Sequence, residues 1–315
     1  MTSAIFTKPW PYLALILANV IWGGNFVVAK ITLQEFPIFS LAFFRFALAA
    51  LLLAPFFWTA TPLGGKKIEI DKKDLPRLVA TGVLIITLNV TFFFAGIQKT
   101  TAINASVLTL IIPLISVLLG WWFLHEHIYL INILGVVLGL GGAIIIIGLP
   151  QIFLGSFSPT VLMGNLLIIL ASISWVWGAV LSRQLLTKYP SLTVTAFAFG
   201  VGAVTFLVPA INEYLQNPGW PDKVSMLGIL GLTYMILLSS ISAYFLFEWG
   251  LSRTSVSKAN LFQYLEPFVA TGLALLVLGE VISMPFLVGA VLIAVGVYWG
   301  TLAKETHHHH KIHRH

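Results

Sequence analysis

The chain has 315 residues, of which 58% are hydrophobic and 9% are charged, and its mean hydropathy is +0.97. Soluble domains carry about 25% charged residues, so this composition excludes a soluble globular fold. The formal net charge of +6 does not indicate nucleic-acid binding, because the basic residues lie in short segments between apolar runs. The absence of cysteine excludes disulfides, thiolate metal sites and thiol catalysis.

Apolar runs long enough to cross a bilayer follow one another along the whole chain. About 20 apolar residues span a membrane as a helix, so we expect an all-α membrane protein with ten transmembrane helices. In chain order, the predicted spans cover residues 11–28, 37–58, 78–98, 102–124, 129–149, 161–182, 192–211, 226–247, 259–279 and 284–302. The first run is interpreted as a retained span rather than a cleaved signal peptide.

The distribution of basic residues gives these spans a direction. With the N-terminus in the cytoplasm, thirteen of the seventeen Lys and Arg residues lie on the cytoplasmic side. The exceptions are Lys30, Lys99 and Lys223 outside, and Arg45 within a span. Because short cytoplasmic segments of membrane proteins are enriched in Lys and Arg, we expect both termini in the cytoplasm.

The sequence repeats itself after 154 positions. The coinciding pairs are Gly24/Gly178, Gly96/Gly250, Thr100/Thr254, Ala105/Ala259, Pro113/Pro267, Glu126/Glu280, Gly135/Gly289 and Gly142/Gly296. Each half has five spans, an odd number, so the second half enters the membrane in the opposite orientation. Inverted repeats are typical of carriers that bind substrate near the bilayer midplane. We expect one five-helix repeat over residues 8–150, a second over 159–303, and a cytoplasmic His-rich tail over 304–315.

Three features together resemble a known family. They are the segment Trp22-Gly-Gly-Asn25-Phe-Val-Val-Ala-Lys30, Arg45 in the second span, and a Pro and a Glu thirteen residues apart in each half. This pattern resembles the EamA branch of the drug/metabolite transporter superfamily. The resemblance implies a ten-helix basket with a central cavity and the fifth and tenth helices at its periphery. It also implies export or exchange of small metabolites, with amino acids, including aromatic ones, as the best-known cargo. Gln184 and Phe199 depart from the pattern where the first half has Lys30 and Arg45.

Two ionisable residues inside spans are the main candidates for substrate binding. Arg45 can bind a substrate carboxylate through its forked donors, or it can be structural, paired to backbone carbonyls or to another helix, or snorkelling outward. Glu266 directly precedes Pro267, which predicts a break in the ninth span. Its carboxylate can bind a substrate ammonium group or a proton, or it can cap local backbone or be held neutral by burial.

Further candidates are polar or aromatic residues at membrane depth. Glu248, five residues before Arg253, is interpreted as one partner of an interfacial ion pair, with proton coupling as its functional alternative beside Glu266. The expected lining of a cavity consists of Trp22, Asn25, Trp175, Trp177, Gln263 and Tyr264. For each aromatic residue, ordinary packing is the alternative, and Asn89 is expected to bond across helices or to orient substrate.

Several apparent motifs carry little weight. Gly135-x3-Gly139 and Gly296-x3-Gly300 permit close helix packing, either within the chain or at a dimer face. The run His125-Glu126-His127 lacks the spacing of a zinc protease helix. His307–His310 with His313 and His315 could bind metal in solution but is interpreted as a tag remnant or an inert tail. The sequence therefore predicts no metal site and no cofactor.

The leading hypothesis is a secondary transporter that exports or exchanges small amphipathic metabolites, such as amino acids, by alternating access. The expected partners are this small-molecule substrate and membrane lipid, without nucleic acid, and the transporter is a monomer or a homodimer. The expected location is the inner membrane of a bacterium. A membrane-embedded enzyme acting on lipids or isoprenoids is the alternative, although the acidic residues are scattered rather than clustered. A channel is a third alternative.

Overall fold

The computed structural model describes residues 9–59, 70–115, 118, 130–147, 158–254, 259–260 and 262–310, with side chains omitted at 55–59, 147 and 300–310. The expectations for His125, Glu126, His127, His313 and His315 lie outside these residues. Throughout the described part the chain is helical, without strands, which confirms the predicted all-α class. Five helices are long and apolar enough to cross a membrane, and five shorter apolar helices complete the predicted ten, counted over the described residues.

The first repeat contains five helical spans. These are α1 (Trp10–Thr32), α2 (Ile38–Thr59), a third span of α3 (Leu75–Gly82), η1 (Val83–Leu88) and α4 (Asn89–Ile97), a fourth of α5 (Ala102–Leu108) and η2 (Thr109–Ile111), and α7 (Leu130–Ile147). The second repeat contains α9 (Pro159–Leu185), α10 (Ser191–Gln216), an eighth span of α11 (Met226–Tyr234), η4 (Met235–Ser242) and α12 (Ala243–Leu251), a ninth of η5 (Phe262–Tyr264), α14 (Leu265–Leu273) and η6 (Ala274–Leu278), and α15 (Met284–His310).

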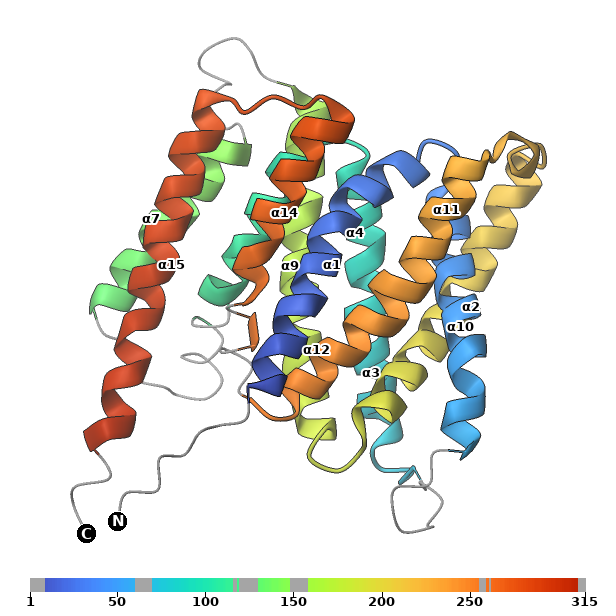
Figure 1. The fold of residues 1–315 in the computed structure, drawn as a ribbon, viewed down its shortest axis with the longest axis horizontal. Helices are drawn as coiled ribbons and strands as arrows, with labels where there is room; N and C mark the ends of the chain where they lie inside the picture. Colours follow the sequence, from blue (N-terminus) through green and yellow to red (C-terminus); the bar gives the residue numbers. More distant parts are fainter. Residues whose placement is uncertain are drawn as a thin grey trace.

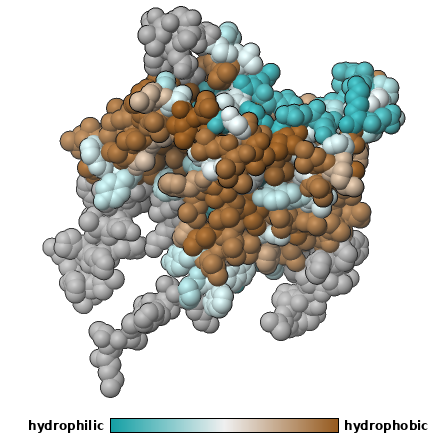
Figure 2. Space-filling model, turned by 45° about the horizontal axis from the view of Figure 1, so that its top comes forward, coloured by the Kyte–Doolittle hydropathy of each residue, from teal (hydrophilic) through white to brown (hydrophobic). Residues whose placement is uncertain are grey.

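The outer surface of the bundle is apolar. Large hydrophobic side chains such as Leu51, Val204 and Leu276 are exposed along the spans. Figure 2 shows that hydrophobic residues cover most of the visible body and that hydrophilic residues gather at one end. Such a band must face lipid, since water-exposed surfaces of this size are unfavourable. The chain is therefore an integral, multi-pass membrane protein.

The fifth and tenth spans, α7 and α15, lie side by side at one edge of the bundle (Figure 1). A Cβ atom added to Gly142 would lie 2.5 Å from the Gly289 carbonyl oxygen, and one added to Gly296 would lie 2.5 Å from the Gly135 carbonyl oxygen. The 154-residue offset converts the first contact into the second. The two glycine contacts therefore relate the repeats by a two-fold axis between these helices, which confirms the inverted repeat and shows that the glycine motifs pack within the chain.

The third and eighth spans each contain a π-helical segment at the same place in the repeat. Shifting η1 by the repeat offset places it at residues 237–242, inside η4. Such segments disturb the regular backbone ladder and are frequent at functional sites. Side chains from other spans bond to carbonyls of both segments: Ser174 Oγ donates to Leu84 O at 2.7 Å, and Trp22 Nε1 donates to Ser239 O at 3.0 Å.

Polar contacts join the two repeats at the face opposite the chain termini (the opposite face, at the top of Figure 1). The Glu35 carboxylate accepts hydrogen bonds from the backbone nitrogen and the hydroxyl of Ser225, both at 2.7 Å, at the start of α11. The Glu280 carboxylate accepts from the nitrogens of Ala102 and Ile103 at 2.8 and 3.0 Å. Each carboxylate caps the N-terminus of a helix from the other repeat, where the helix dipole favours negative charge.

A second set of contacts joins the repeats at the face where α1 begins and α15 ends (the terminal face). Lys188 Nζ lies 3.3 Å from Asp71 and 2.5 Å from Asp74. The Tyr189 hydroxyl donates to Asp74 at 2.7 Å and accepts from the Asp71 nitrogen at 3.1 Å. The hydrogen bond from Lys188 is the main reason why the pKa of Asp74 is lowered, and the same bond raises the pKa of Lys188.

These two sets of contacts occupy equivalent positions. The repeat offset carries Glu35 onto Tyr189 and Asp71 onto Ser225. We call the Glu35–Ser225 contact the opposite latch, and the contact of Lys188 and Tyr189 with Asp71 and Asp74 the terminal latch. Both latches are formed in this structure, so both faces are held together at the same time.

The divergence at Lys30 is smaller than the sequence suggests. Lys30 Nζ donates to the Thr100 carbonyl oxygen. In the second repeat, Arg183 Nε donates to the equivalent carbonyl, that of Thr254, at 3.1 Å. Gln184 stands where the lysine is expected, but the neighbouring Arg183 supplies the cationic donor, so this carbonyl has a cationic partner in both halves.

Candidate functional site

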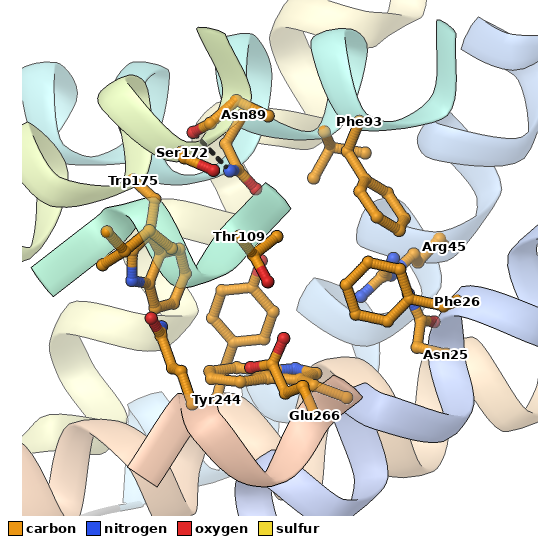
Figure 3. A pocket seen from close by; sticks show the side chains of 15 residues that line it. Asn25, Phe26, Arg45, Asn89, Phe93, Thr109, Ser172, Trp175, Tyr244 and Glu266 are labelled. Carbon is orange, nitrogen blue, oxygen red and sulfur yellow. Dashed lines mark hydrogen bonds between the residues drawn. The ribbon is translucent and has the colours of Figure 1, made fainter. Parts of the chain in front are cut away.

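A central cavity of about 90 Å³ lies between the two repeats. Its lining comes from α1, α2, α4 and the fourth span in the first repeat, and from α9, α12, η5 and α14 in the second. The lining side chains are Trp22, Asn25, Phe26, Arg45, Asn89, Val90, Phe93, Thr109, Ile112, Ala171, Ser172, Trp175, Tyr244, Gln263 and Glu266. Figure 3 shows that Arg45, Trp175, Thr109 and Glu266 approach the same space from different helices.

Arg45 is the cationic group of this cavity. Its side chain is 3% exposed, and its guanidinium lies over the Phe46 ring at 4.9 Å. Nε donates to the Ser240 hydroxyl at 2.7 Å and Nη2 to the Ser239 hydroxyl at 2.9 Å. Within the described residues no carboxylate pairs with it. Of the structural alternatives, the guanidinium shows the pairing to another helix, since both of its hydrogen-bond partners are hydroxyls of η4 rather than backbone carbonyls. This pairing is compatible with substrate binding, which stays a prediction.

Glu266 is the anionic group of the cavity. It is 6% exposed, and no hydrogen bond or ion pair joins its carboxylate to any residue in the described ranges. The predicted break takes the form of a change of helix type, from the 3₁₀ turn η5 to α14, which begins one residue before Glu266. Pro267 fits there because the first turn of a helix leaves its N–H groups unpaired.

The Trp-Gly-Gly-Asn segment of α1 packs directly beneath Glu266. A Cβ atom on Gly23 would lie 3.0 Å from the Glu266 carbonyl oxygen and 2.7 Å from Val269 Cβ. A Cβ atom on Gly24 would meet the Tyr234 hydroxyl, which donates to the Ile21 carbonyl at 2.7 Å. The two glycines therefore let α1 approach the second repeat closely enough for its polar residues to reach the cavity.

Aromatic rings form one wall of the cavity. Trp22 contacts Trp175 and Tyr244 edge to face, with ring centroids 5.2 Å apart in both pairs. Phe247 packs against both tryptophans at 5.2 Å. Trp22 is fixed by its hydrogen bond to η4, whereas the Trp175 indole N–H has no partner. This wall is suited to an apolar or aromatic group, with an indole N–H available at its edge.

Three unsatisfied polar atoms also belong to the cavity lining. They are Asn25 Oδ1, Gln263 Oε1 and Trp175 Nε1, each buried without a hydrogen-bond partner. Buried polar atoms are normally paired. Two acceptors and one donor left free around a shared space indicate a place for a polar ligand or for ordered water.

The structure brings together six of the predicted site residues in this cavity: Trp22, Asn25, Arg45, Trp175, Gln263 and Glu266. Trp177, Tyr264 and Glu248 do not line it. Residues that the sequence did not single out complete the lining, among them Phe93, Thr109 and Tyr244. Asn89, which donates to the Ala171 carbonyl at 2.9 Å, also reaches the cavity.

Glu248 has a different environment from the one expected. It is 3% exposed and accepts a hydrogen bond from the Ser182 hydroxyl at 2.7 Å. Arg253 instead donates to the Trp249 carbonyl and the Ser252 hydroxyl and lies over the Trp249 ring at 4.0 Å. The predicted Glu248–Arg253 ion pair is therefore wrong, because Glu248 points into the bundle and Arg253 lies along its surface.

Metal binding finds no support in the described side chains, among which no group of three His, Asp or Glu residues is placed to hold an ion. The cavity offers one guanidinium, one carboxylate, amide groups and aromatic rings. That set can bind a small molecule with both charged ends and an apolar part, without covalent chemistry.

Comparison with known proteins agrees with the fold. The profile of the EamA-like transporter family matches residues 9–148 and 162–301. An uncharacterized transporter of Archaeoglobus fulgidus is 32% identical over 93% of this chain and 98% of its own length. The uncharacterized transporter YyaM of Bacillus subtilis is 26% identical over 91% of this chain and 92% of its own.

More distant proteins share the same architecture. A WAT1-related protein of Arabidopsis thaliana is 25% identical over 91% of this chain and 81% of its own length. One crystal structure superposes with a TM-score of 0.64 at 18% identity, covering 95% of this chain and 99% of that one. At this identity the structural match supports the fold alone.

Proposed function

Because the chain belongs to the EamA-like transporter family, we propose that it transports small solutes that carry a carboxylate, an ammonium group and an apolar side chain, such as amino acids. Transport itself follows from the family. The substrate class rests on one observation: Arg45 and Glu266 line the same cavity, and neither has an oppositely charged partner among the described residues.

Energetics makes this observation informative. An ionisable side chain at the centre of a span costs roughly 2.5–3.5 kcal/mol on insertion scales, and buried charges without partners are unfavourable. A zwitterion would place its carboxylate at Arg45 and its ammonium group at Glu266, and so would compensate both side chains. The aromatic wall of Trp22, Trp175 and Tyr244 would contact its side chain. Phosphorylated cargo fits less well, since Arg45 is the one basic residue of the lining.

The proposed mechanism is alternating access between the two repeats. Both latches are formed around the cavity of about 90 Å³, so we expect the entry of an amino acid to require the helices to separate. The latches support two such movements, because each joins the repeats at one face only. Opening the terminal latch would admit solute from one side, and opening the opposite latch would release it on the other. We further propose export, in a bacterial inner membrane with the terminal face in the cytoplasm, as either a monomer or a homodimer.

Flux measurements with three related solutes test the substrate class. Proteoliposomes would be assayed with phenylalanine, with phenethylamine, which lacks the carboxylate, and with phenylpropionate, which lacks the ammonium group. We expect phenylalanine to be preferred. Arg45→Gln should abolish the preference for phenylalanine over phenethylamine. Glu266→Gln should abolish the preference for phenylalanine over phenylpropionate. Arg253→Gln, a surface arginine, is the matched control and should leave both preferences intact. Unchanged preferences in both cavity variants would exclude this substrate class.

Proton coupling at Glu266 is tested in the same vesicles. Glu266→Gln should abolish uptake driven by a pH gradient while leaving exchange without a gradient measurable. Glu248→Gln, which removes a buried carboxylate outside the cavity, separates the two candidates for the coupling site. An unchanged proton dependence in Glu266→Gln would rule out that residue.

A further inference from the structure

Arg45 is held by two consecutive serines of the π-helical segment η4. Its Nε donates to Ser240 Oγ at 2.7 Å and its Nη2 to Ser239 Oγ at 2.9 Å, and both serines are fully buried. Consecutive residues of an α-helix do not face the same direction. Here both hydroxyls, from consecutive residues of a π-helical segment, reach one guanidinium.

The symmetry-equivalent positions have different residues. The repeat offset carries Arg45 onto Phe199, and it carries Ser239 and Ser240 back onto Ile85 and Ile86. All three counterparts are apolar and at most 2% exposed.

Arg45, Ser239 and Ser240 therefore form one polar set, which is present at one interface and absent as a whole at the other. One repeat interface contains arginine with two serines, and its symmetry equivalent contains phenylalanine with two isoleucines. Serines that only served the π-helical backbone would be needed in both segments. Their restriction to the segment that faces Arg45 indicates that they serve the arginine.

The geometry leaves one edge of the guanidinium free. Arginine has five N–H donors in a planar fork. The bonds to the two serines use the edge formed by Nε and Nη2. The other edge, formed by Nη1 and the second N–H of Nη2, makes no hydrogen bond to the described residues. An edge of two parallel N–H groups matches a carboxylate in bidentate fashion.

We infer that Ser239 and Ser240 are positioning residues that fix Arg45 so that its Nη1–Nη2 edge binds the substrate carboxylate. This inference rests on the proposed function. The serines determine carboxylate specificity through the orientation of the guanidinium, without contacting the substrate. The carboxylate end of the solute is therefore bound at the α2–η4 interface, on one side of the pseudo-two-fold axis.

The experiment compares KM and maximal flux for phenylalanine and phenethylamine in proteoliposomes. The variants are Ser239→Ala, Ser240→Ala and their double, with Ser242→Ala as control. Ser242 lies in the same π-helical segment, but its hydroxyl is exposed and donates to the Leu237 carbonyl of its own helix at 2.8 Å. Ser239→Thr keeps a hydroxyl at this position, so its KM for phenylalanine should stay close to that of the unsubstituted protein.

We expect the double alanine variant to raise KM for phenylalanine by about tenfold or more, since hydrogen bonds to charged groups contribute about 1.5–3 kcal/mol. KM for phenethylamine and both maximal fluxes should change little. In an Arg45→Gln background the serine substitutions should add no further loss. An equal loss for both solutes would show that the serines only support the fold, and would overturn the inference.

The experiment distinguishes failure of the proposed function from failure of the positioning role of the serines. If Arg45→Gln leaves the preference for phenylalanine over phenethylamine unchanged, the proposed function itself is refuted. If Arg45→Gln removes the preference but the serine variants do not, the carboxylate site stands and the positioning role of the serines is refuted.

Discussion

The close contact of α7 with α15 can be tested quantitatively at two neighbouring glycines, because only one of them lies in that contact. Gly141 and Gly142 are both in the middle of α7, so replacing either by alanine gains about 1 kcal/mol of helix propensity. A Cβ atom on Gly141 meets nothing within 4 Å. A Cβ atom on Gly142 lies 2.5 Å from the Gly289 carbonyl oxygen and 2.9 Å from the backbone nitrogen of Ile293.

Because these neighbours of Gly142 are backbone atoms, they cannot rotate away, and the helices must separate. Overpacking of this kind typically costs 1–3 kcal/mol. The free energy of unfolding of Gly142→Ala should therefore lie about 1–3 kcal/mol below that of Gly141→Ala. Gly296→Ala, at the equivalent contact with Gly135, should resemble Gly142→Ala.

Unfolding of the purified protein in detergent, followed by tryptophan fluorescence against denaturant, measures the differences. Comparison of the two neighbouring variants cancels the propensity gain, so the remaining difference reports the contact alone. If Gly141→Ala and Gly142→Ala agree within about 0.5 kcal/mol, the backbones of α7 and α15 do not approach one another as described, and the two-fold axis placed between them is refuted.

Three further predictions concern the contacts between the repeats. Since the chain contains no cysteine, Thr109→Cys in the cavity can be labelled with an impermeant thiol reagent. Lys188→Gln should raise labelling from the terminal face, and Glu35→Ala, which removes both bonds to Ser225, should raise it from the opposite face. Increased labelling from the same face in both variants would contradict the roles of the latches. Because the pKa of Asp74 is lowered, its contribution to the stability of the terminal latch is present above the unfolded value of 3.8 and is lost as the pH falls through the lower folded value. Because the pKa of Lys188 is raised, its contribution is lost only as the pH rises above 10.5. Labelling from the terminal face should therefore stay constant between these two pH limits. Glu280→Gln removes a charged cap from α5 and should lower the free energy of unfolding by about 1–2 kcal/mol. The same denaturant titration measures this change, and an unchanged free energy would show that the cap contributes nothing.

The sequence predicted the architecture well because lipid imposes a simple rule on composition. Ten apolar runs and a constant offset suffice for the spans and their inversion. Arg45 and Glu266 were identifiable because charges inside spans are rare. Trp22 and Asn25 were identifiable as an aromatic and a polar residue at membrane depth, and the structure adds that they flank the two glycines that bring α1 against α14.

The rest of the cavity depended on helix rotation, which periodicity does not determine in a membrane. Phe93 and Tyr244 are ordinary aromatic residues of apolar spans, and only the turn of α4 and α12 points them inward. The π-helical segments shift this register further, so the pairing of Arg45 with serines on η4 was not predictable. The Glu248–Arg253 pair failed for a related reason: spacing along one helix said nothing about Ser182 on its neighbour.

The two latches differ in their sensitivity to salt. The terminal latch contains an ammonium group between an exposed carboxylate, Asp71, and a half-buried one, Asp74, and exposed pairs of this kind are screened as ionic strength rises. The opposite latch pairs a carboxylate with an amide and a hydroxyl, which a screening cloud weakens less. Equivalent positions in the two repeats thus respond differently to the same electrolyte. A change in the salt concentration of one compartment is therefore expected to loosen the terminal latch more than the opposite latch.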